Sequence, residues 1–235
     1  AGRDGVGGLV EISGLEELTL DGHVSTTAES GLTGTLLLDP VNILIAASDN
    51  PDGNLTPEQI SSAVGSNHVV VHTTDSEKTE NGIIEVRAPI EYDSENSLTF
   101  LAHSNVDVSE NIQNSGSGDL TLVAGWDGVT EAPGGNGPEP TSIGEPFDVQ
   151  SLLNTPDAYG NDNAFVVLAN WSGTSTAVGS RGGTTSLLGY DVTLWGEQNK
   201  DILNAPRMIG YLKQAGDTGE AAGDIYVDAH SLVHC

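Results

Sequence analysis

The chain has 235 residues, and its 34 acidic side chains against 7 basic ones give a formal net charge of −27 at pH 7. This balance excludes nucleic acid as a partner and disfavours an anionic membrane surface, because few lysines and arginines are present to neutralise phosphates. No apolar run approaches the roughly 18 residues that a membrane span needs, so we expect no membrane insertion.

Short apolar or alternating runs, separated by Gly, Asn, Asp and Ser, make up most of the first half of the chain. They predict β-strands, because alternation and β-branched residues suit an extended backbone and the polar residues between them suit turns. In chain order the predicted strands are 9–12, 18–20, 23–26, 35–38, 43–46, 68–72, 83–86, 98–102, 106–108 and 120–123.

One helix is predicted among these strands, from Thr56 to Val64. Thr56 is the N-cap, Pro57 takes the first helical position and Gln59 the third, which together form a capping box. Apolar residues then recur at helical spacing on one face. A helix of about two turns is too short for more than capping the fold or forming part of a loop.

A degenerate repeat between residues 83 and 123 favours a solenoid over a β-sandwich. Its unit consists of an apolar strand, a polar corner, a second apolar strand and an Asn before an apolar residue. A period of roughly 20 to 25 residues is typical of a β-helix, whereas antiparallel hairpins would indicate a Greek-key β-sandwich, the alternative fold. The β-helix predicts one core on successive layers, formed by Leu98, Phe100, Leu120 and Leu122, with Ile83, Ile84 and Val86 in the same stack.

The second half of the chain is less regular. Residues 131–146 are rich in Gly and Pro and predict a loop, and strand-like runs resume at 164–169, 186–194 and 223–229. We expect one domain over 1–235, with regular layers in 1–130, the loop at 131–146, and an irregular region followed by resumed layers in 147–235. Neither end carries an evident amphipathic cap, so further layers of a longer polypeptide or stacked identical subunits are the expected partners.

Several segments carry a family resemblance. Residues 8–14, followed by 20–24 and by Gly-Thr-Leu-Leu-Leu-Asp-Pro at 34–40, resemble filamentous-haemagglutinin-like exoproteins of two-partner secretion systems, in the stretch downstream of the secretion domain. Further matching pieces lie at 55–60, 83–90, 98–102 and 105–108, and fainter ones at 177–181 and 189–194.

The resemblance covers residues 7–125 well and the remainder loosely. It implies an all-β, right-handed parallel β-helix and an extracellular location on a bacterial cell surface. It also implies a non-catalytic role as an adhesin or a filament building block. A secretion domain is not visible in the sequence, so the route of export rests on the resemblance alone.

A calcium site and an enzyme are alternatives that the acidic residues raise. Asp49, Asp52 and Asn54 gather oxygen ligands beside a turn glycine, as Ca²⁺ requires, but the bidentate glutamate of an EF-hand is missing. The same residues form ordinary turns, so the expected cofactor is none. A polysaccharide-cleaving β-helix would need a carboxylate pair, such as Asp107 with Glu110, and a basic residue, and the sequence marks out no pair.

The histidines do not predict a metal site. His68 and His72 flank three valines, and on a strand they lie about 13 Å apart, too far to share an ion. We expect all six histidines to be solvated.

A carbohydrate-binding module is the other alternative, and host or matrix glycans would be its partners. Trp126, Trp171 and Trp195 would form its aromatic platform only if they were exposed together. Asn170 fits the acceptor pattern for N-glycosylation. Cys235 is the sole cysteine, so an internal disulfide is excluded, and an intermolecular thiol contact and a plain free thiol are the alternatives.

Overall fold

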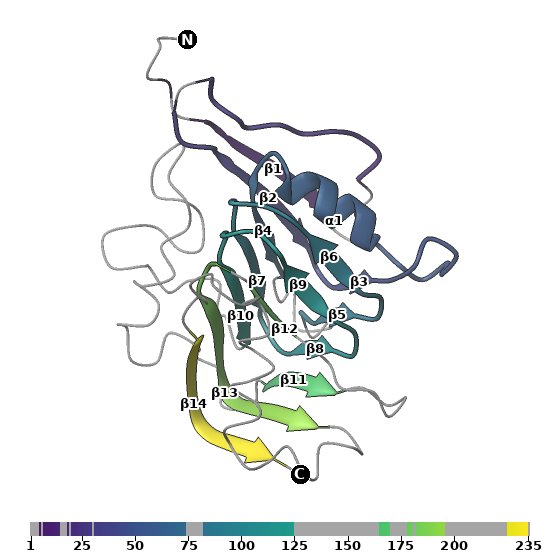
Figure 1. The fold of residues 1–235 in the computed structure, drawn as a ribbon. Coiled ribbons are helices and arrows are strands. Elements are labelled where there is room, and N and C mark those ends of the chain that lie inside the picture. The colour runs from purple at the N-terminus through teal and green to yellow at the C-terminus, as the bar shows by residue number, and fades with distance from the viewer. Residues whose placement is uncertain are drawn as a thin grey trace.

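A computed structural model describes the fold over residues 5, 7–14, 18, 20–29, 31–73, 82–124, 165–169, 178–180, 182–195 and 225–234. In this part of the chain every strand pairs with its neighbours in parallel, and one helix accompanies the strands (Figure 1). The predicted all-β class is therefore confirmed, and the β-sandwich alternative, which requires antiparallel hairpins, is wrong for the described strands.

Within the described ranges, fourteen strands and the helix follow one another in chain order, as Figure 1 labels them. They are β1 (Leu9–Gly14), β2 (Thr35–Pro40), β3 (Ile43–Ile45), α1 (Pro57–Val64), β4 (His68–His72), β5 (Ile84–Val86), β6 (Ile90–Tyr92), β7 (Leu98–Ala102), β8 (Val106–Val108), β9 (Ile112–Asn114), β10 (Leu120–Ala124), β11 (Phe165–Ala169), β12 (Val178–Ser180), β13 (Thr185–Trp195) and β14 (Ile225–His234).

The strands form three ladders that the chain visits in a fixed order. Ladder one runs β1-β2-β4-β7-β10 and continues into the first part of β13. Ladder two runs β3-β5-β8-β11 and continues into the second part of β13, so one 11-stranded sheet contains both ladders. Ladder three is β6-β9-β12. Successive triplets such as β4-β5-β6 and β7-β8-β9, called layers below, each contribute one strand to every ladder.

The register between layers has a constant offset in the most regular part of the chain. Leu98 pairs with Leu120, Ile84 with Val106, and Ile90 with Ile112, and the separation along the sequence is the same in all three pairs. This common separation, called the layer offset below, falls within the period that the sequence predicts. Because strand neighbours come from corresponding positions of successive layers, identical faces of the strands stack on one another.

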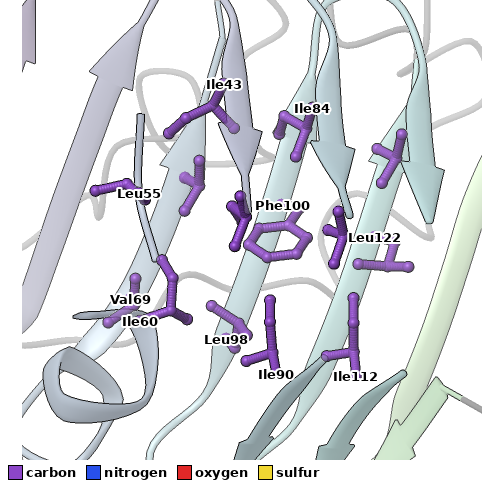
Figure 2. Packing of buried hydrophobic residues seen from close by; sticks show 14 of the residues in the cluster. Ile43, Leu55, Ile60, Val69, Ile84, Ile90, Leu98, Phe100, Ile112 and Leu122 are labelled. Carbon is purple, nitrogen blue, oxygen red and sulfur yellow. The ribbon is translucent and has the colours of Figure 1, made fainter. Parts of the chain in front are cut away.

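One apolar core lies between the ladders. Figure 2 shows Phe100 and Leu122 of ladder one, Ile84 of ladder two and Ile112 of ladder three meeting in the same interior. Leu98, Phe100, Leu120, Leu122, Ile84 and Val86 all belong to it, as predicted. Ile83 does not: it is half-buried and precedes β5, and its carbonyl accepts a hydrogen bond from the backbone N–H of Ile43. The prediction for Ile83 is wrong because alternation turns it away when Ile84 points inward.

Helix α1 forms as the sequence predicts, with Thr56 as the N-cap and both hydrogen bonds of the capping box present. Its buried face packs beside β6, the first strand of ladder three. There the hydroxyl of Ser61 donates to the carbonyl of Glu91 at 2.9 Å, and the Ser94 hydroxyl donates to the carbonyl of Val64 at 2.9 Å. Helix α1 therefore lies beside β6, the described strand at which ladder three begins.

Buried asparagines bind backbone groups where the chain enters ladder one, Asn67 between α1 and β4 and Asn114 at the end of β9, before β10. The Asn67 side chain accepts from the backbone N–H and the hydroxyl of Thr26, both at 2.8 Å, and donates to the carbonyls of Val24 and Ala63. Asn114 holds the corresponding corner two layers further on. Each amide satisfies backbone groups that would otherwise be buried without partners at a turn.

Candidate functional site

A cavity of about 190 Å³ lies between α1 and residues 20–24. Its wall is fixed by Gln59, whose side chain donates to the carbonyl of Leu20 at 2.8 Å and accepts from the backbone N–H of Thr56 at 2.8 Å. His23, Glu58 and Ser62, which supply other polar groups of the lining, are exposed. The cavity is smaller than the ~300–1,000 Å³ of typical ligand sites, and it lacks the desolvated polar centre that would orient a substrate.

The acidic turn proposed for calcium is built by local hydrogen bonds. The side chain of Asn50 accepts from the backbone N–H of Asp52 at 3.0 Å, which is an Asx turn. The side chain of Asn54 accepts from the backbone N–H of Leu44 at 2.7 Å and so joins the turn to β3. Among the described residues, three or more His, Cys, Asp or Glu side chains do not gather into a metal-binding group. Asp49 and Asp52 are exposed in this turn.

Removal of calcium therefore tests the turn directly. We expect a chelator to leave the melting temperature almost unchanged, because the side chain of Asn54 already bonds to the backbone of β3. A site kept at a hundred times its dissociation constant would instead add about 2.7 kcal/mol of stability. Calorimetry with and without chelator distinguishes the two cases. A drop of several degrees that Asp52→Ala abolishes, and that exposed Asp21→Ala does not, would establish a calcium site.

Histidine burial differs from the sequence prediction. His72 is 7% exposed, so the expectation of a solvated side chain is wrong for this residue. His68 is half-buried, and its Nδ1 accepts from the backbone N–H of Ser97 at 3.0 Å. Burial lowers the pKa of His68, and the nearby Asp119 opposes that change. Both histidines lie on β4, most of which is buried on both sides.

His72 also lies beside a carboxylate. Its Nδ1 is 3.5 Å from Oδ1 of Asp39, and its buried Nε2 has no hydrogen-bond partner among the described residues. Burial, and then the neighbouring His103, lower the pKa of His72 to about 4. An adjacent carboxylate alone would raise this pKa, but at 3.5 Å the contact is long and the loss of solvation outweighs it. At pH 7 the imidazole is neutral, so the contact with Asp39 is not an ion pair.

The lowered pKa predicts acid sensitivity. The pKa of His72 is about 4 in the folded chain and 6.5 in the reference state, so on acidification the unfolded chain takes up the proton first. The contribution of His72 to stability is complete above pH 6.5 and falls between pH 6.5 and pH 4, by at most ~3 kcal/mol because Asp39 favours the protonated ring. Urea titrations from pH 7.5 to 4 measure this slope. His72→Gln should flatten it, and a slope unchanged by His72→Gln but removed by His23→Gln would contradict the assignment.

Ladder two brings together two carboxylates and a basic residue. Glu85 pairs with Asp107 in register, and Arg87 donates from Nε to Glu85 Oε2 at 2.9 Å and contacts the same oxygen through Nη2 at 2.7 Å. Burial and Glu85 raise the pKa of Asp107, and Arg87 opposes them. The sequence offered Asp107 with Glu110 only as an example and marked out no pair. The layer offset, which joins Glu85 to Asp107, is the signal that would have found this group.

This carboxylate pair lies on the outer side of ladder two and not in the cavity beside α1. Arg87 and Glu85 each expose more than a third of their side chains, so solvent screens the group. Arg87 already engages Glu85, and this engagement reduces repulsion between stacked layers. The geometry supports a role in holding layers together better than general acid and base chemistry, which needs two carboxylates facing one substrate.

The other predicted site residues are not tested. Trp126, Trp171, Asn170 and Cys235 lie outside the described residues, as does the predicted loop at 131–146. Trp195 ends β13 and pairs with Ala169 along ladder two, and its side chain is also outside the described part. The glycan platform, the glycosylation site and the intermolecular thiol therefore stay predictions.

Comparisons of the chain with protein-family models, with curated proteins and with solved structures give no match. Within the described ranges, no helix has the length and apolar character needed to cross a membrane.

Proposed function

We propose that the chain is a structural or adhesive building block of an extracellular bacterial rod or filament, without catalytic activity. The observation that supports this most is the stacking of parallel strands at a constant layer offset around one apolar core. A stack of this kind lengthens by adding layers, and each added layer stabilises the layer against which it packs. The finer fold proposed is a right-handed β-helix, in which the three ladders are the sides of one solenoid.

The use of buried polar groups supports the same proposal. Asn67 and Asn114 bind backbone groups at corners, and Ser94 bonds to the end of α1. Arg87 donates a hydrogen bond to Glu85, the in-register neighbour of Asp107, so the Glu85 carboxylate already has a partner within the stack. These groups stabilise the stack, which is what a surface rod requires. The resemblance of residues 7–125 to filamentous-haemagglutinin-like exoproteins supports the extracellular location and the adhesive role.

Among the described strands β1 pairs with β2 alone, so this edge of ladder one is the place where a partner would add. The residues of β1 are half-buried or exposed. A parallel strand with an open side offers backbone N–H and C=O groups to another layer. We propose that this edge meets further layers of a longer polypeptide or a stacked copy of the chain.

Sedimentation of the chain across a salt series tests this proposal. The net charge of −27 opposes stacking at low ionic strength, so association should strengthen as salt is added. Electron microscopy of the same samples should show rods that lengthen with association. A monodisperse monomer at every salt concentration, with no rods, would count against the building-block role.

A further inference from the structure

The described strands leave ladder one open at both ends. β1 pairs with β2 alone and β14 pairs with β13 alone, so each offers a row of backbone groups that no other described strand pairs. Figure 1 shows the two strands at opposite ends of the stack. Ladder two is bounded differently at the β1 end, because the N–H and C=O of Leu44 in β3 bond to Asn54. The adjacent Leu55 forms a parallel bridge with Ile45.

The inward residues of ladder one form two columns that run through successive strands. Below Val10, the first column contains Leu36, Val69, Leu98, Leu120 and Thr185. Below Ile12, the second column contains Leu38, Val71, Phe100, Leu122 and Leu187. The members on β2, β4, β7 and β10 are all 0% exposed, whereas Val10 and Ile12 are half-buried. Both columns therefore reach β1 with apolar side chains that one more strand would bury.

The register of β14 continues the same columns at the other end of the stack. Ile225 pairs with Thr185, and Val227 pairs with Leu187. A second copy with its β14 beside β1 in this register would place Ile225 next to Val10 and Val227 next to Ile12. Both apolar columns would then run across the junction between the copies. A slip of one residue in either direction would instead place Tyr226 in one of the inward columns, so the pattern favours a single register.

The outward positions of the two strands are compatible with this register. Glu11 of β1 would lie beside Tyr226, and Ser13 would lie beside Asp228, so carboxylates would not be directly opposed at these positions. Glu11 would still lie diagonal to Asp228, with the two Cα atoms ~8 Å apart. Repulsion across this diagonal is weakened by salt, so the junction should form more readily as the ionic strength rises.

We propose that the open edge of β1 is a docking surface for residues 225–229 of β14 in a second copy, so that copies stack head to tail with ladder one continuous across them. This inference rests on the proposed building-block function and names the partner of the β1 edge. Only the first half of β14 takes part. Its second half pairs along ladder two, and the corresponding edge of ladder two at the β1 end is already bonded to Asn54 and Leu55.

Disulfide formation between engineered cysteines tests the proposal in the full chain. In a Cys235→Ser background, Ser13→Cys and Asp228→Cys would lie side by side across the junction, with Cα atoms ~4.8 Å apart and within reach of a disulfide. Within one chain, β1 and β14 are six strand steps or ~29 Å apart, which excludes an intramolecular bond. Mild oxidation of the two single variants mixed at high salt should therefore give crosslinked dimers.

Exchanging the partners tests the register. Glu11→Cys with Tyr226→Cys is a second in-register pair and should also crosslink. The crossed pairs, Ser13→Cys with Tyr226→Cys and Glu11→Cys with Asp228→Cys, are diagonal at ~8 Å and should crosslink at least about tenfold more slowly. Each variant serves in one in-register and one crossed pair, so a misfolded variant would be recognised by failing in both. Equal rates for all four pairs would overturn the proposed register.

A charge substitution tests the same junction without thiols. Glu11→Lys replaces repulsion toward Asp228 of the neighbouring copy by attraction, so half-maximal association should need at least about twofold less salt. Glu91→Lys makes the same charge change at an exposed position of ladder three and should have a smaller effect. Equal effects of the two substitutions would mean that only net charge matters and would count against a junction at β1.

The possible failures are distinguishable. Dimers formed by Ser13→Cys alone would show that two β1 edges meet each other, which would overturn the head-to-tail arrangement. Rods that form without a disulfide between Ser13→Cys and Asp228→Cys would overturn this junction and leave the building-block function intact. A chain that stays monomeric at every salt concentration would overturn both.

Discussion

Replacing Phe100 with alanine should lower the free energy of unfolding by about 4 kcal/mol, because the change removes the largest fully buried side chain of the core. Phe100 is 0% exposed and lies in register between Val71 of β4 and Leu122 of β10. Figure 2 places its ring in the interior, where side chains from the other ladders also point. Three layers meet around this ring, so the surrounding strands cannot move inward to fill the space without breaking their hydrogen bonds.

Chemical denaturation of the purified chain measures this loss. Phe100→Leu, which keeps part of the volume, should cost less than half as much as Phe100→Ala. Gln113→Ala, at the middle of β9 on the outer side of ladder three, should change stability by less than ~0.5 kcal/mol. A cost below ~1 kcal/mol for Phe100→Ala would mean that the successive layers do not share one packed core.

The local elements were predictable because their signals are local. The capping box of α1 involves Thr56, Pro57 and Gln59, which are adjacent in sequence, and the structure reproduces it. Alternation predicts the strands of ladders one and two in the regular layers, and the repeat predicts their parallel stacking. It did not predict β6 and β9 of ladder three, and the predicted strand at 23–26 is not a strand in the structure. Ile83 was misplaced because Ile83 and Ile84 are both apolar, and only the register with β3 and β8 shows which of them points inward.

Features that depend on neighbouring layers were not predictable. His72 ends the run His-Val-Val-Val-His, which is equally compatible with either side facing solvent, and its place beside Leu101 and Asp39 follows only from the pairing of β4 with β7 and β2. Glu85 and Asp107 become neighbours only through the layer offset, which a degenerate repeat does not fix to the residue. Asn67 and Asn114 read as ordinary turn residues, because the backbone groups they bind are fixed by the meeting of distant segments.

Asn114→Ala should be the most damaging polar substitution in the described layers, lowering the free energy of unfolding by about 3 kcal/mol or more. The Asn114 side chain accepts from the backbone N–H groups of Ser94 and Gly116, each at 3.0 Å. It donates to the carbonyls of Ser94 and Gly118, each at 2.9 Å. Asn114 is 2% exposed, so water cannot replace these bonds. The carbonyls of Ser94 and Gly118 keep hydrogen bonds from Gly118 N–H and the Ser180 hydroxyl, whereas the N–H groups of Ser94 and Gly116 lose their acceptor, at ~1–3 kcal/mol each.

Asn114→Asp separates the loss of donors from the loss of volume. The carboxylate keeps the acceptors for Ser94 and Gly116 but turns a negative charge toward the carbonyls of Ser94 and Gly118, so at pH 7 we expect a loss at least as large as that of Asn114→Ala. Burial should raise the pKa of the new carboxyl, and protonation restores one donor, so Asn114→Asp should gain stability relative to Asn114→Ala as the pH falls to about 5.

Asn50→Ala is the matched control for these variants. The Asn50 side chain makes one exposed hydrogen bond to the backbone of Asp52, so its loss should cost less than ~0.5 kcal/mol. Denaturant midpoints of the three variants at pH 7 and pH 5 give the comparison. Equal small losses for Asn50→Ala and Asn114→Ala would show that the corner between β9 and β10 does not depend on its amide. A large loss confined to Asn114 would show that its side chain stabilises the contact between successive layers in addition to the hydrogen bonds between their strands. Such side-chain bonds help a layer of only three short strands to stack stably.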